Sequence, residues 1–339
     1  MNKTVNKKLI YVGFSFLHHG NHAGYNQIAN YLDYDKKIKC QREFNFIQKN
    51  TWFARIAKKI FGNRLWWVEL HLIAMSVIRP NQLIFHLIYG ENTYKHLGKF
   101  KFGNKIALTL HQPPSFFIDE KQKSFVNSLK LVDKLIVMSA EMETYFKSLF
   151  PTKDIKYIPH GIDTTFFKPK DTKKNQIIMV GNWLRDFDFA AKVFQSLISR
   201  NVNLTINIIT HPNNYFSFSG VNVTLLSDIK DDELLKLYQE SKIVFLPLFR
   251  FTANNAILEA SACGCSVIVA TDKNNFLVKN ESSVLFVEKE IESVCETIEN
   301  QLENWTTEKG LKNRDNMIAQ FDWHIIARQT KQFLLSNND

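Results

Sequence analysis

Short, mostly apolar runs recur along the chain, each bounded by glycine, proline or polar residues. They are LIYVGFSF, QLIFHLIYG, KIALTLH and KLIVMSA in the first half, then QIIMVGN, LTINIIT, VNVTLL, KIVFLPL and SVIVATD. Such continuous runs are typical of parallel strands buried on both faces. Helical patterns lie between them, at 24–33, 53–77, 120–130, 187–200, 231–240 and 255–263, and again from about 288 to 335. This alternation predicts α/β architecture with two doubly wound, Rossmann-like domains in series.

The alternation breaks at FPTKDIKYIPHGIDTTFFKPKDTKKN, a stretch with three prolines, clustered lysines and little periodicity. We expect this stretch to connect the domains. The predicted division is an N-terminal domain over 1–165, a second domain over 166–315, and a C-terminal helix over 316–339 that packs back on the first domain. Ligands of open parallel sheets bind at the carboxyl ends of the strands, so two such domains facing each other would hold a substrate in the cleft between them.

The net charge of +10 is unevenly distributed. Residues 1–165 hold 24 lysines and arginines against 12 aspartates and glutamates, whereas residues 166–339 hold 19 against 21. The excess in the first half indicates an anionic partner, such as a membrane surface, a phosphorylated acceptor or nucleic acid; the alternative is basic residues scattered for solubility. No nucleic-acid-binding motif is recognisable, so we expect no nucleic acid.

Targeting and redox signals are weak. The basic start and the apolar run that follows lead into histidines instead of a small-residue cleavage site, so this run is interpreted as a buried first strand. No apolar run approaches the ~18 residues that span a bilayer. The four cysteines include no CxxC pair, which favours a reducing cytoplasm. We expect a cytoplasmic protein that is soluble or peripheral.

The most unusual stretch is FRFTANNAILEASACGCS, a loop that enters a short helix ending at Gly264. The first backbone N–H groups of this helix, near Asn254, Asn255 and Ala256, are expected to be unpaired and to favour a phosphate. Glu259 lies about one and a half turns further on, where a carboxylate can accept from the cis-diol of a ribose. The alternative is a helix capped by Thr252 or Asn254, with Glu259 solvated.

These residues carry a resemblance to the retaining glycosyltransferases of GT-B architecture, family 4. Members commonly have a strand ending in proline, then E-A-x-A-C-G, a strand and aspartate; the chain has Pro247, EASACG at 259–264, and Asp272. PHGID at 159–163 looks like the family's P-N-G-V-D, and Val180-Gly181 resembles the start of its phosphate-facing loop. The family usually carries another glutamate eight positions before the ribose-binding one. Phe251 stands there, so donor-sugar recognition is not carried over.

The resemblance implies roles for further residues. It places Gly181 and Arg185 at the donor diphosphate, where a guanidinium stabilises the departing nucleoside diphosphate. It places His111, which directly follows a strand, at the transferred sugar, with a structural histidine as the alternative. A small-residue loop with His22, Gly24 and Tyr25 is expected on the acceptor side.

The family implies no metal requirement, and the candidate ligands agree with this. Asp186 and Asp188 form a DxD, which we interpret as helix capping because both lie in a first turn. Asp33 and Asp35 form a second DxD, at a helix end, and are not interpreted as metal ligands either. His18 and His22 have no acidic ligands nearby.

The first-half charge is concentrated in TWFARIAKKIFGNRLWW, residues 51–67, which combines cations with aromatic residues. As a helix it suits an anionic membrane surface; a helix docked on the first sheet with a basic solvent face is the alternative.

Together these features predict a hexosyltransferase-type enzyme that moves a sugar from a UDP or GDP donor to a glycan or lipid-linked acceptor. The resemblance implies retention of configuration, no cofactor and a role in bacterial surface polysaccharide synthesis at the inner membrane face. The alternatives are a nucleotide-sugar epimerase of the same architecture and a catalytically degenerate binding protein.

Overall fold

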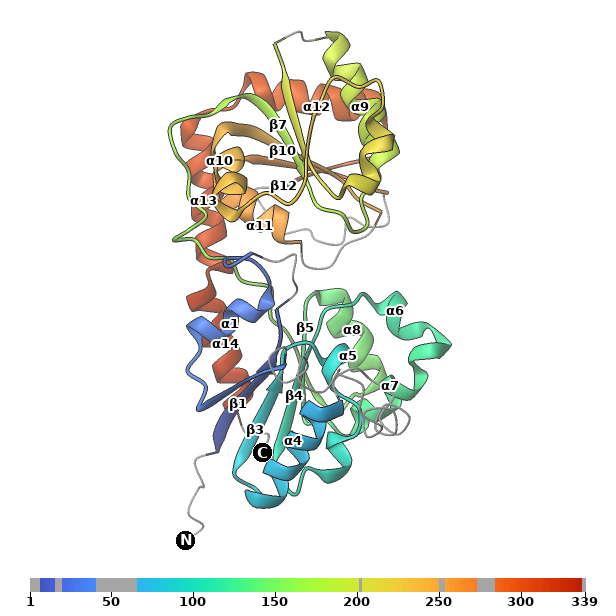
Figure 1. Ribbon diagram of the computed structural model, residues 1–339, viewed down its shortest axis with the longest axis vertical. Coiled ribbons are helices and arrows are strands. Elements are labelled where there is room, and N and C mark those ends of the chain that lie inside the picture. Colours follow the sequence, from blue (N-terminus) through green and yellow to red (C-terminus); the bar gives the residue numbers. More distant parts are fainter. Residues whose placement is uncertain are drawn as a thin grey trace. The chain divides into compact units, whose positions relative to one another are not determined.

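The structure, a computed structural model, describes residues 7–15, 20–40, 66–200, 203–249, 254–272 and 284–336. The chain forms two compact units, shown in Figure 1. The first unit is Met1–His19, Gly24–His160 and Ile326–Asp339, and the second unit is Gly20–Ala23 and Gly161–Ile325. The second unit thus begins after His160, whereas the predicted first domain ended at residue 165. The C-terminal segment that belongs to the first unit begins at Ile326, whereas the predicted C-terminal helix began at residue 316.

The first unit is built on a parallel sheet of six strands in the order β2-β1-β3-β4-β5-β6. The four predicted strands are present, as β1, β3, β4 and β5. Two strands at the sheet edges were not predicted. The first is β2, where only Ile38 is buried, and the second is β6, which lies inside the stretch expected to connect the domains. The strands are β1 Lys8–Gly13, β2 Lys36–Lys39, β3 Leu83–Leu87, β4 Lys105–Leu110, β5 Lys134–Val137 and β6 Asp154–Tyr157.

Helices of varied length cover this sheet, and several are single turns. The predicted helix over 24–33 is shorter, and the one over 120–130 divides into three pieces. The elements are η1 Tyr25–Gln27, α1 Ile28–Tyr31, α4 Trp66–Ile78, α5 Gly90–Thr93, η2 Leu97–Phe100, α6 Pro114–Ile118, η3 Glu120–Gln122, α7 Lys123–Ser128, η4 Leu129–Leu131 and α8 Ala140–Leu149.

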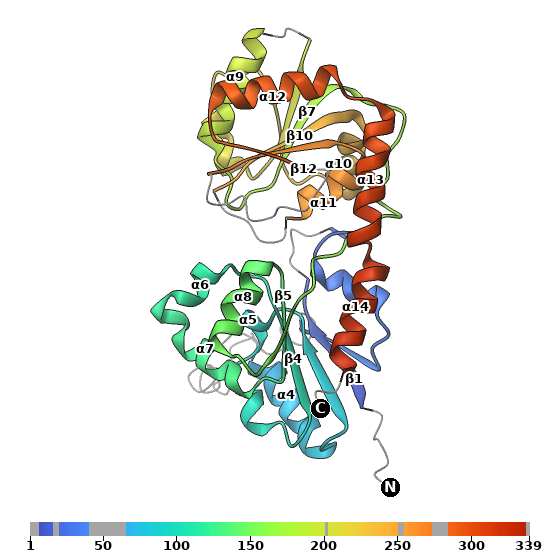
Figure 2. The same cartoon turned by 180° about the vertical axis from the view of Figure 1, so that it is seen from behind.

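The last helix, α14 (Trp323–Leu335), is fixed to the first sheet by a buried lysine. Lys134 begins β5, is 5% exposed, and donates from Nζ to the carbonyl oxygens of Phe333 (2.7 Å) and Ser336 (2.8 Å). A buried ammonium requires such acceptors, and a cation at the last turn complements the helix dipole. The helix therefore lies against the first unit, as Figure 2 shows.

The second unit has a parallel six-stranded sheet of order β12-β11-β10-β7-β8-β9. The order reverses between β7 and β10, which makes the crevice at their carboxyl ends the topological switch point. Five of the strands were predicted; β12 was not. The strands are β7 Lys174–Val180, β8 Thr205–Ile209, β9 Thr224–Leu226, β10 Ser241–Pro247, β11 Ser266–Ala270 and β12 Val284–Val287.

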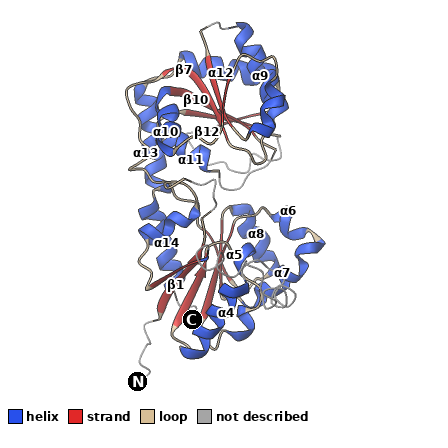
Figure 3. Cartoon of the chain, viewed as in Figure 1, coloured by secondary structure: helices blue, strands red, loops and turns tan. Residues whose placement is uncertain are grey.

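Helices lie on both faces of this second sheet (Figure 3), and each face has its own apolar cluster. Helices α9 and α10 have the predicted bounds. The helical region predicted from 288 divides into α12, α13 and α14, because Thr306 caps α13 and Asp322 accepts from the His324 N–H at the start of α14. The helices of the unit are α9 Phe187–Arg200, η5 Pro212–Phe218, α10 Asp231–Glu240, α11 Asn255–Ala262, α12 Ile291–Glu303 and α13 Thr307–Phe321.

The four cysteines are free and buried. Within the described ranges no helix has both the length and the apolar character needed to cross a bilayer.

One arginine fixes helix α11 against α13. Arg314 donates from Nη1 to the carbonyl oxygens of Phe167 (2.7 Å) and Ala262 (2.8 Å), and from Nη2 to that of Thr164 (2.8 Å). Ala262 is the last residue of α11, whose final carbonyls lack partners within the helix. The guanidinium therefore ties the end of α11 to the chain that enters the unit.

We predict that Arg314→Met lowers the free energy of unfolding by about 1–3 kcal/mol, because carbonyls that are sheltered from water lose their donors. Urea denaturation of the full chain measures this. The matched control is Arg328→Met, which alters an exposed arginine of α14. Equal stabilities of the two variants would contradict the assignment.

Candidate functional site

Two loops meet at the switch point of the second sheet. The loop after β7 runs from Gly181 to α9, and the loop after β10 begins at Leu248. The backbones of Arg185 and Leu248 form an antiparallel bridge, and the Asp186 N–H donates to the Pro247 carbonyl at 3.0 Å. These contacts hold the base of the crevice together before any ligand binds.

Arg185 lies at the centre of this junction. Its Nε donates to the Val180 carbonyl (3.0 Å) and its Nη1 to the Trp183 carbonyl (3.1 Å). Burial lowers its pKa to about 10, so it remains a cation at neutral pH. Gly181 has a φ of 114°, and a Cβ there would lie 2.7 Å from Nη2 of Arg185. Both the backbone conformation and the packed guanidinium therefore require glycine at 181.

The entrance of α11 is joined to Arg185. The side-chain oxygen Oδ1 of Asn254 caps the helix by accepting from the Ala256 N–H (3.1 Å), and it also accepts from Nη2 of Arg185 (3.4 Å). The prediction that the Ala256 N–H is unpaired is wrong, because its own cap satisfies it. Among the described residues the Asn255 N–H has no hydrogen-bond partner. An anion can thus be met by Arg185, by the Asn255 N–H and, once the Asn254 carboxamide turns away, by Ala256.

Glu259 is a buried carboxyl group with 4% exposure. Its Oε2 accepts from the Tyr238 hydroxyl at 3.0 Å, and in the described part of the chain Oε1 has no hydrogen-bond partner. Burial raises its pKa to about 7; the hydrogen bond from Tyr238 opposes this, and the nearby charge of Asp231 adds to it. The alternative of a solvated Glu259 is therefore wrong.

Segment Gly20–Ala23 belongs to the second unit by its contacts. Nδ1 of His22 donates to Oδ2 of Asp163 at 2.8 Å, and its ring stacks on Phe166 with centroids 3.7 Å apart. Burial alone would raise the pKa of Asp163, but hydrogen bonds, from Thr165 first and then from His22, hold it below its usual value. Asp163 is therefore ionised at neutral pH and orients the His22 ring.

The same segment also contacts helix α10. The Asn21 N–H donates to Oδ2 of Asp231 at 2.6 Å, and Asp231 is the residue whose charge raises the pKa of Glu259. The loop that carries His22 is thus coupled electrostatically to the candidate ribose carboxylate.

In the first unit, His111 directly follows β4, as predicted. Its backbone N–H donates to Oε1 of Glu91 (2.7 Å), and its Nε2 contacts the Ile88 carbonyl at 2.7 Å. A carbonyl only accepts, so Nε2 carries the proton and Nδ1 has a lone pair. Burial lowers the pKa of His111 to about 4, although the bond to Ile88 opposes this, so the imidazole is neutral at pH 7.

Gly24 and Tyr25 lie beside His111 but do not form an open loop. Gly24 has a φ of 87° and precedes η1, whose first residue is Tyr25. The Tyr25 ring is 1% exposed and meets the His111 ring edge-on, with centroids 5.0 Å apart. Tyr25 is therefore a positioning residue for His111 and is too buried to touch an acceptor directly.

Several residues at these sites escaped sequence analysis. Glu91 holds the loop after β4 through two backbone N–H groups, and burial raises its pKa to about 7 despite those bonds. Lys289, after β12, pairs with Asp186 at 2.8 Å and lies 4.1 Å from the Phe249 ring centroid. Their signal was only a charged residue within a few positions of a strand end, which is too common to be specific.

The DxD aspartates have structural partners. Oδ1 of Asp186 accepts from the Phe189 N–H (3.1 Å), and Asp188 accepts from the Ser217 hydroxyl (2.8 Å). Asp35 accepts from the Leu9 N–H (2.8 Å), and Asp33 pairs with Lys331 (3.7 Å).

The remaining candidates concern metal binding and the membrane helix. Among the described residues no group of three or more His, Cys, Asp or Glu is arranged to hold a metal ion. His18, His19, Thr252, Phe251 and residues 51–65 of the candidate membrane helix lie outside the described residues.

The raised pKa of Glu259 predicts a pH-dependent stability. The native state binds this proton more tightly than the unfolded chain, so the stabilisation is present below the ordinary pKa of 4.5 and is lost as pH rises to about 7. The loss amounts to about 3 kcal/mol. In urea titrations Glu259→Gln should gain stability relative to the parent over this window, with Glu308→Gln as the exposed control. A difference between parent and Glu259→Gln that stays constant between about pH 5 and 8 would contradict it.

We compared the chain with known proteins. Residues 174–304, which contain Arg185, Asn254 and Glu259, match the family model "Glycosyl transferases group 1". No curated protein matches the chain in sequence.

Solved structures with the same fold are numerous but distant in sequence. TarM is 15% identical over 81% of this chain with a TM-score of 0.64, and this chain spans 59% of the length of TarM. Sucrose-phosphate synthase from Thermosynechococcus elongatus is 18% identical, with a TM-score of 0.62 and coverage of 87% of this chain and 82% of its own. HepE from Anabaena, solved with UDP and glucose, is 14% identical, with a TM-score of 0.67 and coverage of 98% and 100%.

These findings confirm the predicted fold. The two parallel α/β units have the GT-B fold of these structures. The match to the glycosyltransferase group 1 model lies within the second unit.

Proposed function

We propose that the chain transfers a hexose from a nucleoside-diphosphate sugar to a glycan or lipid-linked acceptor, with retention of configuration as in family 4. One observation carries the proposal. Arg185 and the capped entrance of α11 meet at the topological switch point, inside the segment that matches the glycosyltransferase model. Anions bind at such positions because a cation and unpaired N–H groups converge there.

The donor diphosphate occupies this junction in our proposal. Arg185 is held by two carbonyls, so its charge is already oriented when the ligand arrives. The anion replaces the carboxamide oxygen of Asn254 on both Nη2 of Arg185 and the Ala256 N–H. Gly181 keeps the floor of the site open to the guanidinium.

Glu259 accepts from the ribose hydroxyls of the donor. Its Oε2 is held by Tyr238, which leaves Oε1 for the ligand. A pKa of about 7 means that donor binding is accompanied by loss of the Glu259 proton in acidic solution. HepE, with a similar fold, binds UDP and glucose, which supports UDP over GDP as the nucleotide.

In the transfer step the bond between the sugar carbon and the diphosphate oxygen breaks, and its electron pair leaves on the nucleoside diphosphate. Arg185 stabilises that charge. The acceptor oxygen bonds the same carbon on the same face, and its proton leaves with the diphosphate. No metal or cofactor takes part in this scheme.

In our proposal His111 accepts a hydroxyl hydrogen of the sugar at Nδ1. Its neutral ring and the Nε2 bond to Ile88 prepare it for that role. His22, oriented by Asp163, faces the acceptor. We place the activity in bacterial surface polysaccharide synthesis, in the cytoplasm and peripheral to the inner membrane.

The donor assignment predicts that Arg185→Gln and Glu259→Ala each weaken UDP binding at least tens-fold, since each loses a charged contact with the ligand. Calorimetry of the full chain measures this. Arg200→Gln, at the far end of α9 and paired with Glu292, is the matched control. Unchanged affinity in either site variant would remove its residue from the donor site.

The role of His111 predicts a difference between two near-isosteric variants. His111→Asn keeps an acceptor where Nδ1 lies, whereas His111→Gln keeps only a donor where Nε2 lies. We expect kcat to fall about 100-fold or more in His111→Gln and less in His111→Asn, with UDP affinity unchanged in both. Equal kcat values in the two variants would leave His111 a structural residue.

The acceptor dependence of turnover separates this function from the alternatives. A transferase forms glycosylated product only when an acceptor is present. Product formed from the donor alone would establish the epimerase, and UDP binding without turnover across acceptor pools would indicate a binding protein.

A further inference from the structure

The amino-terminal edge of the first sheet carries a concentrated positive charge. Because all six strands are parallel, their first residues share one edge, opposite the edge at which His111 follows β4. The segments where five of the six strands begin hold nine lysines and arginines against two aspartates, and the start of β2 adds Lys36 with Asp33 and Asp35. We call the surface of those five segments the amino-edge surface and define it by residues 7–8, 77–82, 99–105, 130–134 and 153–154.

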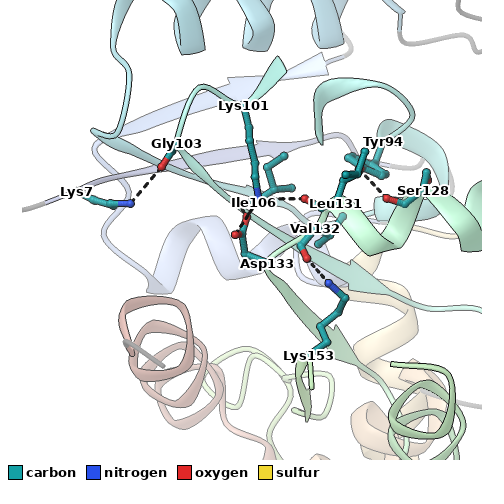
Figure 4. Close-up of polar contacts among 10 residues, drawn as sticks. All are labelled: Lys7, Tyr94, Lys101, Gly103, Ile106, Ser128, Leu131, Val132, Asp133 and Lys153. Carbon is teal, nitrogen blue, oxygen red and sulfur yellow. Dashed lines mark hydrogen bonds and ion pairs between the residues drawn. The ribbon is translucent and has the colours of Figure 1, made fainter. Parts of the chain in front are cut away.

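The two carboxylates of the amino-edge surface are already engaged. Asp133 pairs with Lys101 at 2.9 Å and accepts from the Ile106 N–H at 2.8 Å, as Figure 4 shows. Asp154 pairs with the buried Lys134 at 3.2 Å. Seven cations of the surface have no ion pair with any described residue: Lys7, Lys8, Arg79, Lys99, Lys105, Lys130 and Lys153.

These cations also crowd one another. The pKa of Lys7 is lowered, first by burial and then by the charge of Lys105. The pKa of Lys153 is lowered by burial; the charge of Asp133 opposes this shift, and that of Lys101 adds to it. Such crowding disfavours the charged surface in isolation and is relieved when an anion approaches.

Exposed apolar side chains are interleaved with the cations. The loop KFKFG at 99–103 alternates lysine and phenylalanine, with Phe100 45% and Phe102 50% exposed. At the end of α4, Val77 is 56% and Ile78 74% exposed, and Leu131 is 39% exposed.

Hydrogen bonds join these pieces into one surface. The Asn81 N–H donates to the Phe102 carbonyl at 3.0 Å, and Nζ of Lys101 donates to the Leu131 carbonyl at 3.2 Å. Phe102 has a φ of 44°, a conformation that costs an L-residue of order 1 kcal/mol or more. Its half-exposed ring recovers little of that cost by packing within the chain.

The mixture of cations with aromatic and aliphatic side chains fits an anionic bilayer better than a nucleic acid. Cations between aromatic rings are also typical of surfaces that bind single-stranded nucleic acid. However, the branched aliphatic side chains of Val77, Ile78 and Leu131 cannot stack on bases, whereas they gain free energy in the acyl boundary of a bilayer. Lysines beside them can extend their ammonium groups to anionic headgroups.

We propose that the amino-edge surface docks on a membrane surface rich in anionic lipid. Each unpaired cation near such a surface contributes about 1 kcal/mol, and the exposed rings and aliphatic side chains add burial. The docking is reversible and weakened by salt. It does not depend on the donor assignment, and it rests on residues other than the candidate helix at 51–67.

The docking also has a consequence for the acceptor. The six residues of β4, at about 3.3 Å each, separate the amino-edge surface from His111 by roughly 20 Å. An acceptor anchored in the same bilayer must therefore extend about that far to reach His111.

Flotation of the full chain with vesicles of phosphatidylcholine, with and without phosphatidylglycerol, tests the proposal. We expect binding only with phosphatidylglycerol and weakening in high salt. We expect at least about tenfold loss in Phe100→Ser/Phe102→Ser and in Lys99→Gln/Lys105→Gln/Lys130→Gln. Phe216→Ser and Lys309→Gln/Lys312→Gln change exposed residues elsewhere and should bind as the parent does.

Circular dichroism and thermal midpoints confirm that each variant is folded, so lost binding is not lost structure. The proposal is overturned if the parent does not bind phosphatidylglycerol vesicles, or if the surface variants bind as well as the controls. It is also overturned if the phenylalanine variant binds vesicles normally but loses binding to single-stranded DNA, which would assign the surface to nucleic acid.

Discussion

The second unit depends on the contact between Arg185 and the two strand ends at its switch point. A parallel sheet leaves a crevice where its strand order reverses, and nothing in the sheet itself closes that crevice. Arg185 closes it by bridging to Leu248 through the backbone and by donating to Val180 through the guanidinium. Its remaining nitrogen reaches the cap of α11. One residue therefore joins β7, β10 and α11, and its charge is available to a ligand.

A second candidate functional group, Glu259, is buried near that junction, and its burial raises its pKa. The helix that carries it is almost wholly buried, because small residues at 260–262 let it pack against α13. Burial penalises the carboxylate, and the single bond from Tyr238 does not offset the penalty, so the pKa stays near 7. Arg314 anchors the far end of the same helix. The same burial that holds Glu259 in position therefore disfavours its ionised form.

Sequence reasoning succeeded where one physical signal dominated. Strands buried on both faces are continuous apolar runs, and α9 and α10 begin and end where the periodicity does. The edge strand β2 was missed because it buries only Ile38, so it contains no apolar run to recognise. At the site, the burial of Glu259 was predictable from its small neighbours in the helix. The capping of the Ala256 N–H was not, because an asparagine at a helix entrance can either cap or leave the helix open.

The amino-edge surface could not be located from the sequence. Its nine lysines and arginines lie in five separate segments that only a parallel sheet brings to one edge, since each segment precedes or begins a strand. The same parallel arrangement brings the loop ends, with His111 and Glu91, to the opposite edge. Strand direction thus separates a basic, partly apolar surface from a neutral polar one. In a sheet with mixed strand directions, the basic side chains and the polar loop residues would lie along the same edges. Asp133 and Asp154 would then no longer lie beside Lys101 and Lys134 and could not neutralise them.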